Sequence, residues 1–271
     1  MKEIGLEEMK VIQMDILSAV HRFCVANNLK YSLGCGSMLG CARHKGYIPW
    51  DDDIDIYMLR KDYDQLIKDF PETFDGCYKL AAYKRTANWI DTYGKIYDSR
   101  TILEESGKDR GAGVNIDIFP IDNVPQDEEE WRRYNKHRCF WRDLYYRRIG
   151  NLGVWKRHKE RAFYKDIMMF IVKALLQCVP PKALLMYFNC IVTKYQNKET
   201  GYVFECAQGI FGKNPFPKAL FENLTLMPFE DREYMAFADY DKYLTLHFGN
   251  WREWPPIEKR ITHHDFKAWW K

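Results

Sequence analysis

The sequence predicts an α+β protein with a mixed β-sheet core flanked by helices and a helical part towards the C-terminus. Residues 6–29 carry apolar side chains at helical spacing, short alternating segments between residues 31 and 119 favour strands, and residues 127–197 return to a helical pattern. We expect a core unit over residues 1–126, a helical basic and aromatic segment over 127–200, and a C-terminal part over 201–271 that packs back on the core.

The expected elements follow in chain order. A helix over 6–29 leads to a strand over 31–33, a helical turn or two from Ser37 to His44 with Ser37 as N-cap, and an acidic strand containing Asp53 to Ile56. A helix over 61–70, a β-meander over 77–104 and a strand over 114–119, ended by Pro120, come next. The helical segment breaks near 150–153 and at 180–181; then come mixed short elements over 202–229, a helix over 234–247 and a final aromatic helix.

The composition is that of a folded globular chain: 271 residues, 46% hydrophobic and 29% charged. The net charge of +3 is too small to indicate a nucleic-acid binder by itself. Eight dispersed cysteines without a Cys-x-x-Cys pair predict reduced thiols, and no signal peptide is recognisable at the N-terminus. The most apolar stretch, 167–179, is too short to span a bilayer. We therefore expect a cytoplasmic protein, with peripheral contact at the inner face of the membrane as an option.

The run Trp50-Asp51-Asp52-Asp53-Ile54-Asp55-Ile56 is the most informative motif of the chain. On a strand, Asp53 and Asp55 share one face while the isoleucines point to the other. By the same alternation Asp51 points to the face of Asp53 and Asp55, and Asp52 points to the opposite face. Carboxylates held this close repel one another unless a cation lies between them. Oxygen ligands of this kind suit Mg²⁺, with Mn²⁺ as the alternative ion, which predicts chemistry on a phosphate.

Asp117 is the third candidate ligand. It lies in the apolar segment Asn115-Ile116-Asp117-Ile118, where a lone carboxylate is unfavourable unless it is paired or bound to a cation. If its strand lies beside the acidic strand, Asp53, Asp55 and Asp117 converge on one site. The plainer alternative is a buried hydrogen-bonding residue or a solvent-facing one.

Several further residues are candidates for substrate contacts. Gly36 allows close approach of a phosphate, and Ser37 offers a hydroxyl at a helix N-terminus, which favours anions. Arg43, Lys45 and Lys95 are candidate phosphate ligands, and Asp51 could orient the metal acids or meet a cationic substrate group. His263, with Lys259 and Arg260, is a candidate for phosphate or nucleotide contact after Pro255-Pro256. No histidine has a partner at zinc-ligand spacing.

Residues 131–161 are dense in arginine, lysine and aromatic side chains. The simplest interpretation is an amphipathic helix with a solvated basic face and an aromatic core face. An interfacial surface for anionic lipid and a single-stranded nucleic-acid surface are the alternatives. We favour a core and acceptor-binding role over membrane contact, and expect no nucleic acid.

These motifs resemble the nucleotidyltransferase fold of the DNA polymerase beta superfamily, and more closely the LicD family, which includes the fukutin-type proteins. The resemblance rests on the segment from Gly36 to Asp55, on the segment from Asn115 to Asp122, and more weakly on Tyr243 to Gly249 followed by Pro255-Pro256. It covers most of the chain, and residues 131–197 match least.

The resemblance implies transfer of a phospho-substituent, phosphocholine in the typical case, from a CDP-linked donor to a sugar hydroxyl of a cell-surface glycan or its lipid-linked precursor. Asp53, Asp55 and Asp117 would bind the metal, Asp117 could accept the hydroxyl proton, and Gly36 and Ser37 would hold the donor diphosphate. Two other readings stay open: a nucleotidyltransferase that releases pyrophosphate, and a non-catalytic binding module. The latter is disfavoured because all three carboxylates are present.

Overall fold

The computed structural model describes residues 1–105, 108–109, 111–150, 163–209, 213–262 and 265–271. The helices are α1 (Leu6–Ala26), α2 (Cys35–His44), α3 (Arg60–Asp69), α4 (Glu128–Ile149), α5 (Phe163–Leu176), α6 (Pro181–Val192), α7 (Ala219–Glu222), α8 (Tyr240–Phe248) and the 3-10 turn η1 (Ile257–Lys259). The strands are β1 (Glu3–Ile4), β2 (Ser32–Leu33), β3 (Asp55–Leu59), β4 (Tyr78–Ala81), β5 (Gly94–Asp98), β6 (Thr101–Glu105), β7 (Lys108–Asp109), β8 (Asn115–Asn123), β9 (Tyr202–Glu205), β10 (Phe216–Pro217), β11 (Leu224–Phe229), β12 (Arg232–Phe237) and β13 (Phe266–Trp270). The predicted α+β class is confirmed.

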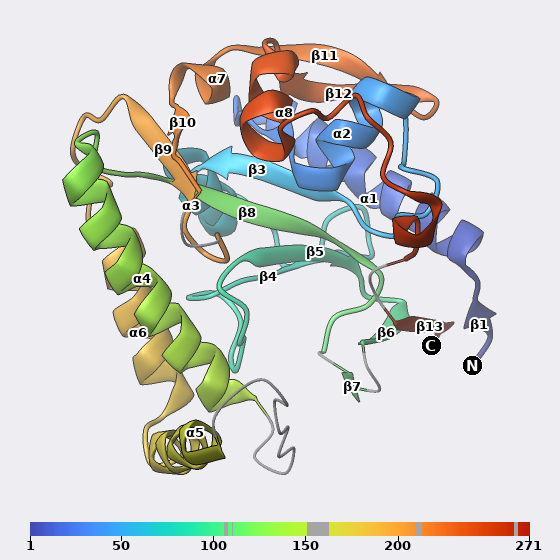
Figure 1. Ribbon diagram of the computed structural model, residues 1–271. Helices are drawn as coiled ribbons and strands as arrows, with labels where there is room; N and C mark the ends of the chain where they lie inside the picture. The colour runs from blue at the N-terminus through green and yellow to red at the C-terminus, as the bar shows by residue number, and fades with distance from the viewer. Residues whose placement is uncertain (106–107, 110, 151–162, 210–212, 263–264) are drawn as a thin grey trace.

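The central sheet is mixed. Its strand order is β10-β9-β8-β3-β2, and β5, which also pairs with β4, joins it on β8. The strand β8 lies parallel to β3 along one edge, while its other edge pairs with β5 and then with β9. As Figure 1 shows, β8 runs through the middle of the molecule beneath β3. The buried Ile56 on β3 and Ile116 on β8 belong to the main core, which places both acidic segments on rigid, inner strands.

Pro120 does not end its strand, contrary to the expectation. The strand β8 continues to Asn123 because Pro120 lies between two pairings: β5 pairs with β8 up to Ile118, and β9 pairs with it from Ile121. A proline that lacks an N–H group is tolerated where no partner strand needs that donor.

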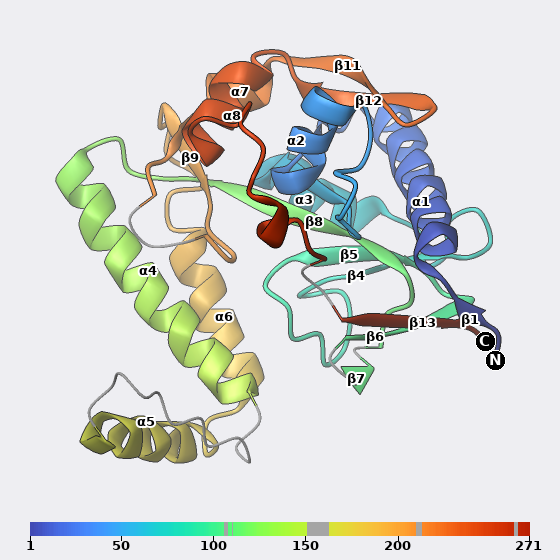
Figure 2. The same cartoon turned by 45° about the vertical axis from the view of Figure 1, so that its right-hand side comes forward.

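The C-terminal predictions were partly wrong. The segment expected as one helix over 234–247 is the hairpin strand β12 followed by α8, and Glu230 takes a positive φ of 56° in the turn that joins β11 to β12. The expected final helix is the strand β13, which pairs with β1 and β6. This pairing brings the two ends of the chain side by side (Figures 1 and 2). The expected β-meander is also only partly correct, because β6 leaves the central sheet for this second one.

The helices α4 and α6 lie side by side and form a leg that extends away from the sheet (Figures 1 and 2). Trp131 and Tyr134 of α4 pack with Phe188 of α6 and Phe204 of β9. Arg138 is fully buried, not on a solvated basic face, and donates hydrogen bonds to the carbonyls of Cys206 (2.8 Å) and Gly209 (2.7 Å). Part of the basic character of this helix therefore anchors it. The three-part division of the chain stays a prediction.

Within the described residues, no single helix has the length and apolar character needed to cross a membrane. One pair, Phe170–Leu176 with Pro181–Val192, meets that test only when its two helices, bent by 100°, are taken together. The described cysteines are all free thiols, as expected.

Candidate active site

The two acidic segments meet where β3 begins. Asp55 and Asp117 are direct partners in the parallel pairing of β3 and β8, and the Asp117 N–H donates to the Ile54 carbonyl at 2.8 Å. Because directly opposed residues of neighbouring strands point to the same face, both carboxylates share one side of the sheet. Ile54 and Ile116, at 0% exposure, take the other side. The expected adjacency of these strands is thus found.

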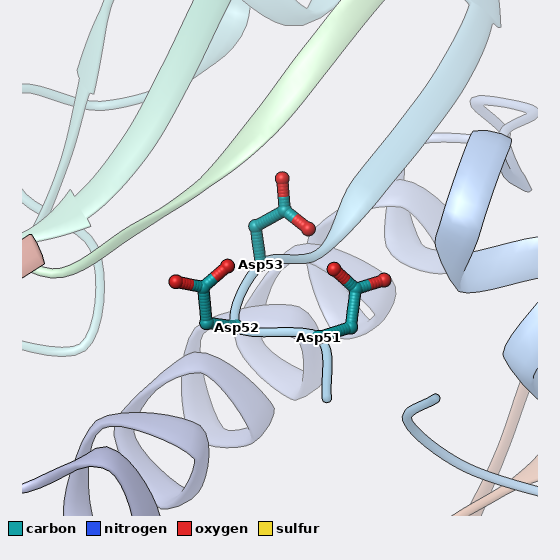
Figure 3. Close-up of side chains that lie close together, drawn as sticks. All are labelled: Asp51, Asp52 and Asp53. Carbon is teal, nitrogen blue, oxygen red and sulfur yellow. The ribbon is translucent and has the colours of Figure 1, made fainter. Parts of the chain in front are cut away.

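Asp53 was expected to lie on the strand, but it does not. The strand β3 starts at Asp55, and residues 51–54 form a bend that opens with a hydrogen bond from Asp51 N–H to the Ile48 carbonyl at 2.9 Å. Without strand alternation, Asp52 does not point away: ligand oxygens of Asp51, Asp52 and Asp53 lie within 4.8 Å of one another. Figure 3 shows the three carboxylates on the same bend.

The site concentrates negative charge around Asp55. Burial raises the pKa of Asp55 well above its ordinary value, and the carboxylates of Asp53, Asp117 and Asp51 raise it further. Carboxylate oxygens are the ligands that Mg²⁺ and Mn²⁺ prefer, and a divalent cation would offset this repulsion. The donor set therefore fits such an ion. Among the described residues, the carboxylates that lie nearest to one another are those of Asp51, Asp52 and Asp53. Asp55 and Asp117 lie next to this group.

Lys95 lies inside the site. Its Nζ forms an ion pair with Asp117 and donates to Asn115 Oδ1 at 3.1 Å, from the strand β5 that pairs with β8. Burial alone would lower the pKa of Lys95, but Asp117 raises it above its ordinary value, so the lysine remains charged. In this structure Lys95 balances a site carboxylate.

Gly36 and Ser37 lie within α2, not at its cap, so the expected N-cap was wrong: Gly34 precedes the helix and Ser37 is its third residue. The Ser37 Oγ accepts a hydrogen bond from the Asp55 N–H at 2.9 Å, which fixes the start of β3 against the helix. A Cβ atom on Gly36 would lie 2.7 Å from Asp51 Oδ2. The Gly-Ser pair therefore shapes the acidic bend.

A cationic and aromatic rim borders the acidic bend. The Arg43 guanidinium lies 5.2 Å from the Trp254 ring centroid and donates to the Trp251 carbonyl at 3.3 Å. Arg260 lies 5.0 Å from the Trp254 ring and 5.6 Å from that of Trp50, the residue before Asp51. Local sequence reasoning missed Trp254, for which the only signal was the Trp-Pro-Pro motif. His263 lies outside the described residues.

Three aromatic residues that could be considered as walls for a quaternary ammonium group, Trp50, Tyr57 and Trp89, do not form a cage. Tyr57 is 3% exposed and packs among Phe119 and Phe221, and Trp89 is 9% exposed with its indole N–H donated to the Tyr93 carbonyl. The Trp50 ring already carries the Arg260 guanidinium. A cation over that ring would meet a like charge.

Comparison with known proteins agrees with this geometry. The family model described as LicD/FKTN/FKRP, nucleotidyltransferase domain, matches residues 28–149, which include every acidic residue of the site. The chain is 30% identical, over 99% of both chains, to the lipopolysaccharide cholinephosphotransferase LicD of Haemophilus influenzae. The chain belongs to the LicD family.

Two shorter similarities accompany this full-length one. An uncharacterized protein of Rickettsia prowazekii is 34% identical over 73 residues, which is 27% of each chain. An uncharacterized protein of Rickettsia typhi is 32% identical over 75 residues, 26% of this chain and 24% of the relative.

Proposed function

We propose that the chain is a metal-dependent phosphotransferase of the LicD type. It moves a phospho-substituent, phosphocholine in the first instance, from a CDP-linked donor to a sugar hydroxyl of a cell-surface glycan or its lipid-linked precursor. Support comes from the full-length similarity to a lipopolysaccharide cholinephosphotransferase. The observation that carries the proposal is the direct pairing of Asp55 with Asp117 beside the Asp51–Asp53 bend.

In this proposal Asp53, Asp55 and Asp117 hold Mg²⁺, or Mn²⁺, which neutralises charge on the phosphates when it is bound. The oxygen of the sugar hydroxyl forms a bond to the outer phosphorus in line with the breaking bond, and cytidine monophosphate leaves. Asp117 accepts the hydroxyl proton, and Lys95 orients its carboxylate through their ion pair.

The donor diphosphate lies between the acidic bend and the cationic rim. Gly36 and Ser37 hold the bend, Arg43 supplies positive charge from the end of α2, and Asp51 contributes a further carboxylate that faces Gly36. His263 remains a candidate donor contact. A nucleotide-linked donor places the reaction on the cytoplasmic side of the membrane, which is part of the proposal.

The test is the product. The purified chain is incubated with CDP-choline, Mg²⁺ and a lipopolysaccharide acceptor, and cytidine monophosphate and phosphocholine-modified glycan are measured. We expect both in equal amounts, none with EDTA, and a loss of at least about 100-fold for Asp55→Asn, because the charge that holds the ion is removed. The exposed Asp69→Asn variant is the matched control and should keep its activity.

Two outcomes would contradict the proposal. Pyrophosphate release from CTP without glycan modification would indicate a nucleotidyltransferase. Full activity in Asp55→Asn, or in EDTA, would exclude the assigned metal site. A thermal-shift panel of CDP conjugates gives a second measurement: a donor should raise the midpoint only when Mg²⁺ is present.

A further inference from the structure

The helix α5 presents an unusual surface. Six large apolar side chains of this helix are exposed: Tyr164 (64%), Ile167 (39%), Met168 (55%), Phe170 (42%), Ile171 (51%) and Leu175 (67%). Positions 164, 168, 171 and 175 recur at helical spacing, so they form one stripe along the helix. Isolated exposed apolar residues are common, but a continuous stripe of them indicates a contact surface.

The position of α5 in the fold gives this stripe a direction. The helix lies across the end of the leg formed by α4 and α6, at the extremity farthest from the sheet (Figures 1 and 2). It joins the leg through Leu176, which packs with Tyr145 of α4 and Leu184 of α6. Because the end of α5 is bent by 100° from α6, α5 can lie parallel to a flat surface while the leg stands nearly perpendicular to that surface.

Basic residues lie at the end of the leg that carries α5. The acidic residues Glu128, Glu129 and Glu130 begin α4 at the end near the sheet, whereas Arg147 and Arg148 occupy its last turn near α5. Lys182 lies in the first turn of α6, and Lys173 lies on α5, on the face opposite the stripe. A helix with an apolar stripe, a basic residue on its other face and further basic residues close by is typical of helices that lie in the interface of an anionic bilayer.

Two other geometries fit less well. The 14 residues of α5 extend about 21 Å, less than the roughly 30 Å of a bilayer core, so the helix cannot span it. The helix α6 cannot extend the span because its residues Leu185 and Phe188 are buried in the packing of α6 with α4. A stripe of about 21 by 10 Å covers roughly 200 Å², well below the about 800 Å² per partner of a stable dimer.

We propose that α5 is an interfacial anchor that rests on the surface of an anionic lipid bilayer. The inserted residues are Tyr164, Met168, Ile171 and Leu175, and the basic residues at the end of the leg meet the lipid headgroups. The inserted stripe lies outside the predicted basic segment 131–161, although Arg147 and Arg148 belong to that segment. The inference does not depend on the reaction proposed above.

The experiment is vesicle flotation with the full chain. Vesicles of phosphatidylcholine alone and of phosphatidylcholine with phosphatidylglycerol are compared at low and high salt. We expect binding to the anionic vesicles that weakens with salt. The double variant Ile171→Glu/Leu175→Glu should lower the partition coefficient at least about tenfold, because two charges enter the apolar stripe.

The matched control is Val11→Glu/Val25→Glu on α1, which makes the same chemical change at aliphatic residues of similar exposure, 61% and 52%. It should bind like the unmodified chain, and circular dichroism with thermal midpoints checks that both double variants fold. Absence of binding to anionic vesicles, or equal binding by the α5 variant, overturns the proposal. The proposal is also overturned if light scattering shows that the unmodified chain is a dimer and that only the α5 variant is a monomer, because the stripe is then a self-association surface.

Discussion

At the scale of single residues, the site concentrates like charge around the half-buried carboxylate of Asp55. The raised pKa of Asp55 means that the metal-free native state binds a proton more tightly than the unfolded chain does. This contribution to stability is complete below the unfolded pKa of about 4 and is lost as pH rises through the folded pKa. The acidic site is therefore destabilising at neutral pH until a cation compensates it.

Asp55→Asn tests this electrostatic cost. In EDTA, the free energy of unfolding of the unmodified chain should fall between pH 5 and pH 8 more than that of Asp55→Asn, because asparagine has no proton to lose. Urea titrations at both pH values measure the difference. Adding Mg²⁺ should stabilise the unmodified chain and leave the variant nearly unchanged. An identical pH dependence in both proteins would contradict the assigned charge crowding.

Gly36 has a role that follows from space. A Cβ atom at this position would lie 2.7 Å from Asp51 Oδ2, so Gly36→Ala should push the Asp51 carboxylate away from the bend. We expect the fold to persist and the Mg²⁺ concentration for half-maximal thermal stabilisation to rise about tenfold, as when a supporting group of a metal site is disturbed. Gly5→Ala is the control, since nothing lies within 4 Å of its added Cβ. If the Mg²⁺ dependence of Gly36→Ala is unchanged, the Asp51 carboxylate does not contribute to binding the ion.

At the scale of elements, an ion pair fixes α3 to the strand that carries Asp117. The Arg60 guanidinium, 8% exposed, makes two hydrogen bonds to the Asp122 carboxylate at 2.7 and 2.8 Å. Asp122 is 1% exposed on β8, so the pair joins the helix that follows β3 to the neighbouring strand. Removing Asp122 leaves the buried guanidinium with only the more distant carboxylate of Asp64, at 3.7 Å, as its counter-charge.

Asp122→Asn should therefore destabilise the fold by about 3 kcal/mol. The double variant Arg60→Met/Asp122→Asn should recover part of that loss, because the buried guanidinium that has lost its main partner is also removed. Urea denaturation of the single and double variants measures both terms. Equal destabilisation by the single and double variants would show that packing, and not charge, holds α3 on β8.

The elements that sequence reasoning predicted well are those with a strong local pattern. The buried Ile12, Ile16 and Val20 gave α1 its helical period, and the isoleucines around Asp55 and Asp117 gave the strands their buried faces. The bend at Asp51–Asp53 broke the expected alternation because β3 begins only at Asp55, which a local pattern does not reveal. The turn at Glu230 was missed since neither Gly nor Asn marks its positive φ.

At the scale of the whole molecule, long-range pairing decides what local sequence leaves open. The segment Phe266–Trp270 has the aromatic content of either a helix or a strand, and only its partners β1 and β6, far away in sequence, make it a strand. The same applies to Trp254 and Arg260, which reach the acidic bend by the return of the chain. Asp55 and Asp117 lie on neighbouring inner strands, and their adjacency could be predicted. Arg43 and Arg260 could be proposed as single cations, but their shared contact with Trp254 could not.

The closure of the two chain ends gives the last prediction. Ala268 is 2% exposed at the centre of β13, where it pairs with Ile4 of β1 and Leu103 of β6. Ala268→Gln places a larger polar side chain in this core and should destabilise the fold by about 2 to 3 kcal/mol. Lys267→Gln, at the exposed neighbouring position, should change stability by less than about 0.5 kcal/mol. Urea denaturation compares the two. Equal stability of both variants would mean that joining the chain ends through β13 contributes little to the fold, and that the central sheet supports the acidic site without it.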